Sequence, residues 1–180
     1  YNFSESDSAE EVIRKMVSHF IEMINDSIRE GIEKSGKNLH EILTLASIIE
    51  GECIVDEERP LVASVYVNRL KKGIRLESDP TIQYIIPDGP RRLLNKDLNI
   101  RSPYNTYRYR GLPPGPVNNP GVKSIIAAVW PAKTDYLYMV ANGDGSHTFT
   151  SNYRDFLRAK RRFQRIRRKV ASELNGGKSN

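Results

Sequence analysis

Two glutamates, Glu50 and Glu52, follow a mostly aliphatic run of the chain, Leu43–Ile49. A helix that buries this run carries Glu50 out of the core at its last turn, beside an apolar wall, and Gly51 is expected to end the helix. A carboxyl group in apolar surroundings resists losing its proton. We therefore expect Glu50 to act as a general acid that donates a proton and later takes one back.

Two further carboxylates, Glu52 and Asp79, lie close enough in the sequence to take part. Glu52 follows Glu50 by two residues, about 200° around a continuing helix, so we expect it to face away and to have a supporting role. Asp79 precedes Pro80, a pattern typical of a helix start with Asp as the N-cap and Pro in the first turn. Asp79 is therefore expected to cap a helix at the border of a cleft.

The chain contains few cysteines and histidines, the usual ligands of zinc. Its single cysteine, Cys53, excludes an internal disulfide, and the three histidines, His19, His40 and His147, are widely separated. Such scattered ligands make a poor metal cluster. We expect no metal and no organic cofactor, and we expect His147 to make structural hydrogen bonds.

The net charge of +6 is concentrated near the C-terminal end. Residues 154–169 hold nine Lys and Arg and one acid, a local charge of +8, so the other residues together carry −2. Clustered cations bind phosphate groups, but the rest of the chain is not basic. An anionic membrane surface or an anionic wall polymer is therefore the expected partner of this segment, and no nucleic acid is expected.

The elements that position these residues are predicted from periodicity and turn residues. The pattern favours a mostly helical α+β fold with a small antiparallel hairpin. No apolar stretch approaches the ~20 residues that span a bilayer. Helices are predicted over residues 9–35 (begun by Ser8 and ended by Gly36), 39–50, 61–72, 121–129 and 152–171, and strands over 136–141 and 147–150.

Residues 74–120 contain eight of the ten prolines and predict a long ordered loop with short helical pieces at 81–85 and 95–98. Loops of this length in compact domains are commonly functional. Aromatic faces and amide side chains suit sugar rings and N-acetyl groups, which indicates a glycan groove. The candidate groove residues are Tyr104, Asn105, Thr106, Tyr107, Gln83 and Asn119.

Asn68 is a polar residue on an otherwise apolar predicted helix. A buried asparagine must find hydrogen-bonding partners. We expect it either to bond the backbone of a loop or to hold Glu50. The last residues, 175–180, are rich in Gly, Ser and Asn and are predicted to be a disordered tail.

An ordered set of short motifs covers about residues 44–149 and resembles the YceG-like family of endolytic murein transglycosylases. Each motif is weakly specific, but their order is very specific. Gly51 and Cys53 depart from the family, which usually has Lys and Thr there. The motifs are LASIIEGE (45–52), VASVYVNRL (62–70), LESDPT (76–81), SPYNTY (102–107), GLPPGP (111–116), NPG (119–121), YLY (136–138) and HTF (147–149).

The resemblance implies a membrane-anchored enzyme that cuts nascent peptidoglycan strands internally, outside the cytoplasm. A membrane helix and a LysM-like subdomain would precede the catalytic part, which would be a single domain over residues 1–174. The family's catalytic glutamate is placed on Glu50. Implied partners are glycan strands and the penicillin-binding proteins of the wall-synthesis machinery.

Several functions remain compatible with the residues. Lytic cleavage needs one acid/base group, which protonates the leaving oxygen and then deprotonates the muramyl C6 hydroxyl to give a 1,6-anhydro ring. A lysozyme-type hydrolase instead needs a second carboxylate about 5 to 9.5 Å away, for which Glu52 and Asp79 are available. A non-catalytic glycan-binding module and a nucleic-acid-binding module that uses residues 154–169 also remain open.

Overall fold

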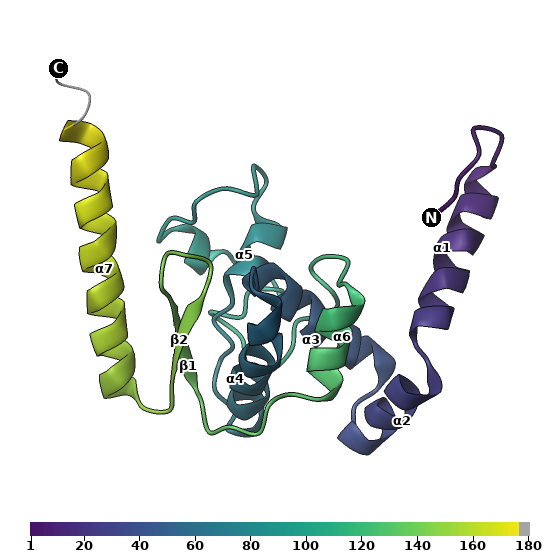
Figure 1. Ribbon diagram of the computed structural model, residues 1–180, viewed down its shortest axis with the longest axis horizontal. Helices are drawn as coiled ribbons and strands as arrows, with labels where there is room; N and C mark the ends of the chain where they lie inside the picture. Colours follow the sequence, from purple (N-terminus) through teal and green to yellow (C-terminus); the bar gives the residue numbers. More distant parts are fainter. Residues whose placement is uncertain (177–180) are drawn as a thin grey trace.

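The computed structural model describes residues 1–176, which form a mostly helical α+β fold with one two-stranded antiparallel sheet (Figure 1). The predicted fold class is confirmed. The elements are α1 (Ala9–Met23), α2 (Asp26–Ser35), α3 (Leu39–Glu52), η1 (Asp56–Glu58), α4 (Arg59–Lys71), α5 (Asp79–Ile85), η2 (Asp97–Asn99), α6 (Val122–Val129), β1 (Tyr138–Ala141), β2 (His147–Thr150) and α7 (Tyr153–Gly176).

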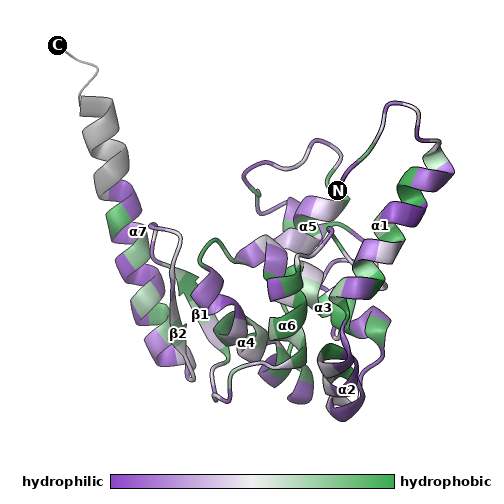
Figure 2. Ribbon diagram, turned by 45° about the vertical axis from the view of Figure 1, so that its right-hand side comes forward, coloured by the Kyte–Doolittle hydropathy of each residue, from purple (hydrophilic) through white to green (hydrophobic). Residues whose placement is uncertain are grey.

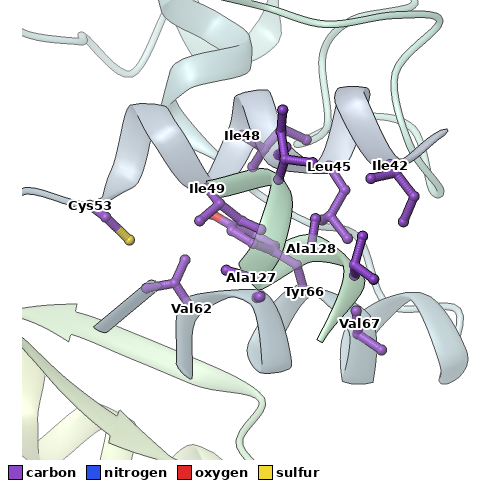
Figure 3. Close-up of a cluster of buried hydrophobic side chains, with 14 of the residues drawn as sticks. Ile42, Leu45, Ile48, Ile49, Cys53, Val62, Tyr66, Val67, Ala127 and Ala128 are labelled. Carbon is purple, nitrogen blue, oxygen red and sulfur yellow. The ribbon is translucent and has the colours of Figure 1, made fainter. Parts of the chain in front are cut away.

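Helix α3 lies at the centre of the core. A capping box of Asn38 and Glu41 begins it, and this pairing satisfies backbone N–H groups that a helix leaves free. Its aliphatic side chains pack against α4 and α6, as Figure 3 shows. Fully buried residues in this contact include Ile42, Leu45, Ile48, Ile49, Val62, Ala63 and Tyr66.

Gly51 does not end α3, which is a correction to the sequence prediction: the helix continues to Glu52, with Cys53 as its C-cap. The glycine instead allows a close approach of α5. A Cβ atom at Gly51 would lie 2.7 Å from the Cβ and Cγ atoms of Pro80, which is shorter than a carbon–carbon contact. The continued helix directs Glu50 and Glu52 to different neighbours.

The single helix predicted over residues 9–35 is also wrong, because two helices, α1 and α2, share this segment. Ile24 ends α1, and the Asn25 side chain accepts a hydrogen bond from the N–H of Ile28 and caps α2. The predicted start at Ser8 and the stop at Gly36, which has a φ of 69°, are confirmed. Helix α1 points away from the core and is amphipathic along its length (Figures 1 and 2).

The hairpin pairs β1 with β2, with Met139 opposite Phe149 and Ala141 opposite His147. Helix α7 packs along it at one edge of the molecule (Figure 1). The Tyr138 and Phe156 rings lie 5.1 Å apart in this contact. Helix α7 is longer than predicted and includes residues 175 and 176, and the rest of the predicted disordered tail lies outside the described residues. No helix in residues 1–176 is both long and apolar enough to cross a membrane.

Candidate active site

Glu52, at the end of α3, is half-buried, and its carboxyl group lies among side chains of α4 and the α5 cap. Its Oε1 accepts hydrogen bonds from the Tyr66 hydroxyl at 2.7 Å and the Ser78 hydroxyl at 3.0 Å. Burial raises the pKa of Glu52 above its ordinary value, and the negative charge of Asp79 adds to this effect, while the hydroxyl donors oppose it. The result is a carboxylic acid that holds its proton more tightly than a surface glutamate does.

A cleft passes Glu52 and Asp79, because both residues line each of two adjoining pockets. The first pocket, of about 330 Å³, extends toward the hairpin and α7 and also contains Tyr107, His147 and Lys160. The second, of about 600 Å³, extends along the Pro-rich segment and also contains Gly51, Pro80, Gln83, Tyr84, Pro90, Val117 and Asn118. The two carboxylates therefore lie where the two parts of the cleft meet.

Asp79 does not have the predicted capping role. It is the first residue of α5, and the N-cap is Ser78, which makes no capping hydrogen bond with its side chain. The Asp79 carboxylate instead accepts a hydrogen bond of 2.5 Å from the Tyr107 hydroxyl. Burial and the adjacent Asp79 charge raise the pKa of Tyr107, so the phenol stays a donor.

Glu50 has polar surroundings, in contrast to the apolar wall predicted from the sequence. Its Oε2 accepts hydrogen bonds from Arg59 at 3.0 Å, Ser124 at 2.7 Å and the N–H of Gly121 at 3.2 Å. Arg59 also pairs with Asp56 at 2.9 Å and is only 10% exposed in its side chain. Neither pocket of the cleft includes Glu50. These contacts make Glu50 part of a cluster that joins α3, η1, α4 and α6.

Opposite stability effects are expected for the two glutamates. A raised pKa means that the folded protein binds the Glu52 proton more tightly than the unfolded chain does. The free energy of unfolding therefore falls as the pH rises above the ordinary pKa of 4.5. Glu52→Gln removes this penalty, so we expect a higher Tm than that of the unmodified protein at about pH 7 and little difference at about pH 3.

Glu50→Gln is the matched control, because it loses the ion pair with Arg59 and should lower the Tm at about pH 7. Thermal unfolding at both pH values measures the two effects. A Tm of Glu52→Gln below that of the unmodified protein at neutral pH would show that the Glu52 carboxylate stabilises the fold.

Asn105 and Thr106, predicted to contact sugar, are buried and bonded internally, which is a correction. The Asn105 amide donates to the carbonyls of Leu98 and Ile100, and its oxygen accepts from the N–H of Tyr107. The Thr106 hydroxyl accepts from the N–H of Ser78 and bonds Thr81. Asn105 and Thr106 therefore hold Tyr107 and Ser78 in place. They do not line the cleft themselves.

The other groove candidates are dispersed. The Tyr104 ring packs against Tyr84 at 4.8 Å between centroids. Gln83 lines the second pocket, but its amide is bonded at both ends to the backbone of Arg91, at 2.6 and 3.1 Å. Asn119 is exposed and lies in a different pocket, between α1 and α6. Of the predicted groove residues, Tyr107 and Gln83 therefore line the cleft.

Asn68 and His147 have structural roles. Asn68 donates to the carbonyls of Thr134 and Tyr136, so it bonds a loop backbone, one of the two roles predicted for it, and does not hold Glu50. The His147 ring bonds the Glu58 carboxylate at 2.7 Å, which confirms the structural role predicted for it. These contacts attach the hairpin to the core.

Sequence reasoning missed Tyr66, Ser78 and Arg59, whose polar atoms contact the two glutamates. Tyr66 lies on the helix predicted over residues 61–72, and a buried tyrosine hydroxyl usually needs a partner. That requirement was the available signal. Within residues 1–176, no group of three or more metal-ligating side chains is close enough to hold an ion.

The helical core, the small hairpin and the cleft that passes Glu52 define an α+β domain with a candidate active site. The chain belongs to the YceG-like family, whose model matches residues 1–162. It is 40% identical to the endolytic murein transglycosylase of Bacillus subtilis over 164 residues, which cover 91% of this chain and 45% of that protein. The endolytic murein transglycosylase of Streptococcus pneumoniae D39 is 33% identical over 161 residues, covering 86% of this chain and 29% of that protein.

The fold also matches a solved structure. The crystal structure of a yceG-like protein from Listeria monocytogenes superposes with a TM-score of 0.80 at 39% identity, over 88% of this chain and 51% of that one. The chain therefore spans less than half the length of the curated relatives it matches and about half of the solved one.

Proposed function

We propose that this domain is the catalytic part of an endolytic lytic transglycosylase that cleaves the β-1,4 bond between N-acetylmuramic acid and N-acetylglucosamine within peptidoglycan strands. We further propose that Glu52, and not Glu50, is its acid/base. The observation that supports this assignment is the position of a half-buried carboxyl group with a raised pKa in the cleft. The names of the relatives support the substrate.

The hydrogen bonds of Glu52 indicate which oxygen carries the proton. Oε1 accepts two hydrogen bonds, from Tyr66 and Ser78, so the proton is expected on Oε2. That oxygen donates to the glycosidic oxygen as the bond from muramyl C1 breaks. The nearby Asp79 carboxylate stabilises the positive charge that develops on the sugar ring.

The same glutamate completes the reaction. Its carboxylate then removes the proton of the muramyl C6 hydroxyl, and the C6 oxygen bonds to C1. The products are a 1,6-anhydromuramyl end and a free hydroxyl on the leaving N-acetylglucosamine. The proton returns to Glu52, and no water is consumed.

Product analysis tests the reaction type. Mass spectrometry of purified peptidoglycan strands after incubation should show internal fragments that end in 1,6-anhydromuramic acid. Fragments with reducing ends, each heavier by one water, would instead indicate a lysozyme-type hydrolase with Asp79 as the second carboxylate.

Asp79→Asn is expected to shift the pH dependence of cleavage. The acid must be protonated to act, so the rate falls as the pH rises through the pKa of Glu52. Because the Asp79 charge contributes to the raised pKa, its removal should move this fall to lower pH. Tyr107→Phe is the control: it removes the hydroxyl bonded to Asp79 and keeps the charge. An unshifted profile in Asp79→Asn would mean that Asp79 does not tune the acid.

The remaining partners are also proposed. Residues 1–174 would form a single catalytic domain, and in the full-length protein a membrane helix and a LysM-like subdomain would place it outside the cytoplasm. Penicillin-binding proteins that extend the nascent strand would be its protein partners. The basic residues 154–169 would contact an anionic membrane surface or wall polymer.

A further inference from the structure

A groove of about 640 Å³ separates α7 from the second strand of the hairpin. Three arginines of α7, two threonines of β2 and the apolar side chains of Phe163 and Ile166 line it. Its two aspartates have partners, since Asp155 pairs with Arg158 and Asp144 accepts hydrogen bonds from Ser146. We propose that this groove is a binding site for a phosphate-bearing polymer. Its lining residues are Asn142, Asp144, Thr148, Thr150, Asp155, Arg158, Ala159, Arg162, Phe163, Arg165 and Ile166.

The arginine spacing suits a chain of anions. Arg158, Arg162 and Arg165 are separated by four and three residues, so they follow one face of α7. Arg158 pairs with Asp155 at 3.1 Å. Within the described part of the chain, no acidic side chain lies within ion-pair distance of Arg162 or Arg165. A guanidinium group binds phosphate through two parallel hydrogen bonds, so these two arginines are the expected phosphate ligands.

The groove is separate from the catalytic cleft. Alternate residues of a strand face opposite sides of a hairpin. Met139, Ala141 and His147 line the cleft pocket that contains Glu52, whereas Thr148 and Thr150 line the groove. A ligand in the groove therefore lies on the other face of the hairpin and does not contact Glu52.

The packing of α7 favours a polymer over a bilayer surface. A helix that lies on a membrane buries its apolar face in the membrane, but α7 packs on the hairpin, where the apolar ring of Phe156 lies 5.1 Å from that of Tyr138. Arg154, Arg161 and Arg168, at seven-residue spacing, lie beside the groove arginines along α7 but do not line the groove. The apolar residues Phe163 and Ile166 lie in the groove itself. A concave site surrounded by the positive charges of α7 attracts a flexible polyanion.

The test is binding of fluorescently labelled poly(glycerol phosphate), followed by fluorescence anisotropy. The variants R162Q/R165Q and R161Q/R168Q remove the same charge from the same exposed helix, and only the first pair belongs to the groove. We expect R162Q/R165Q to weaken binding about tenfold or more and R161Q/R168Q to weaken it by about threefold or less. Circular dichroism confirms that both variants keep their helices.

Three outcomes would overturn the proposal. Equal weakening by the two variants would mean diffuse attraction to α7. Binding to phosphatidylglycerol vesicles without binding to the polymer would indicate a lipid surface. Tighter binding of a DNA oligonucleotide of equal charge would indicate nucleic acid. The proposal rests on the anionic partner proposed for residues 154–169 and not on the lyase chemistry, so Glu52→Gln should bind the polymer as the unmodified protein does.

Discussion

Glu52→Gln is expected to lower the rate of peptidoglycan cleavage by about 10²- to 10⁴-fold, the usual contribution of a general acid/base. Glutamine keeps the shape of the side chain and can still accept from Tyr66 and Ser78. It has no proton to donate at the glycosidic oxygen and cannot take one from the C6 hydroxyl. The rate at which 1,6-anhydromuramyl ends appear on purified strands measures the loss.

Glu50→Gln provides the matched control for activity. It removes the same charge two residues earlier on the same helix, from a side chain that the cleft pockets do not include. We expect it to retain most of the cleavage rate at a temperature where it is folded. If Glu50→Gln loses the activity and Glu52→Gln keeps it, Glu50 is the acid, as the family resemblance implies.

Arg59→Leu is expected to lower the free energy of unfolding by about 3 kcal/mol, the lower end of the range for breaking a buried ion pair. The guanidinium group joins Glu50, Asp56 and Ser124, which come from three different elements. Its removal leaves the Glu50 carboxylate with Ser124 and Gly121 as donors and no opposite charge. The estimate stays at the low end because Glu50 is 31% exposed and keeps some water.

Denaturant unfolding measures this loss. Arg14→Leu is the control, since Arg14 forms an ion pair with Glu10 in which both side chains are largely exposed. Exposed pairs contribute little, so this variant should unfold close to the unmodified protein. An equally small effect of Arg59→Leu would mean that the Glu50 cluster does not hold α3, α4 and α6 together.

Sequence reasoning predicted most of the elements because the signals for them are local. Apolar spacing and the caps at Ser8 and Gly36 are encoded within a few residues. The errors occur where a distant contact overrides a local signal. Gly51 is a reasonable helix stop by itself, but α3 continues through it because Pro80 of α5 packs against it. The helix over 9–35 divides because Asn25 caps a new one.

The sequence by itself determined the mostly helical α+β class, the family, the basic C-terminal helix and the short list of carboxylates that can do the chemistry. Only the tertiary structure decided how those carboxylates differ. Glu50 contacts Arg59 and Ser124, whereas Glu52 contacts Tyr66 and Ser78, which lie 14 and 26 residues further along the chain. A carboxyl group ionises according to its burial and its neighbours, and those neighbours are assembled only when the helices pack together.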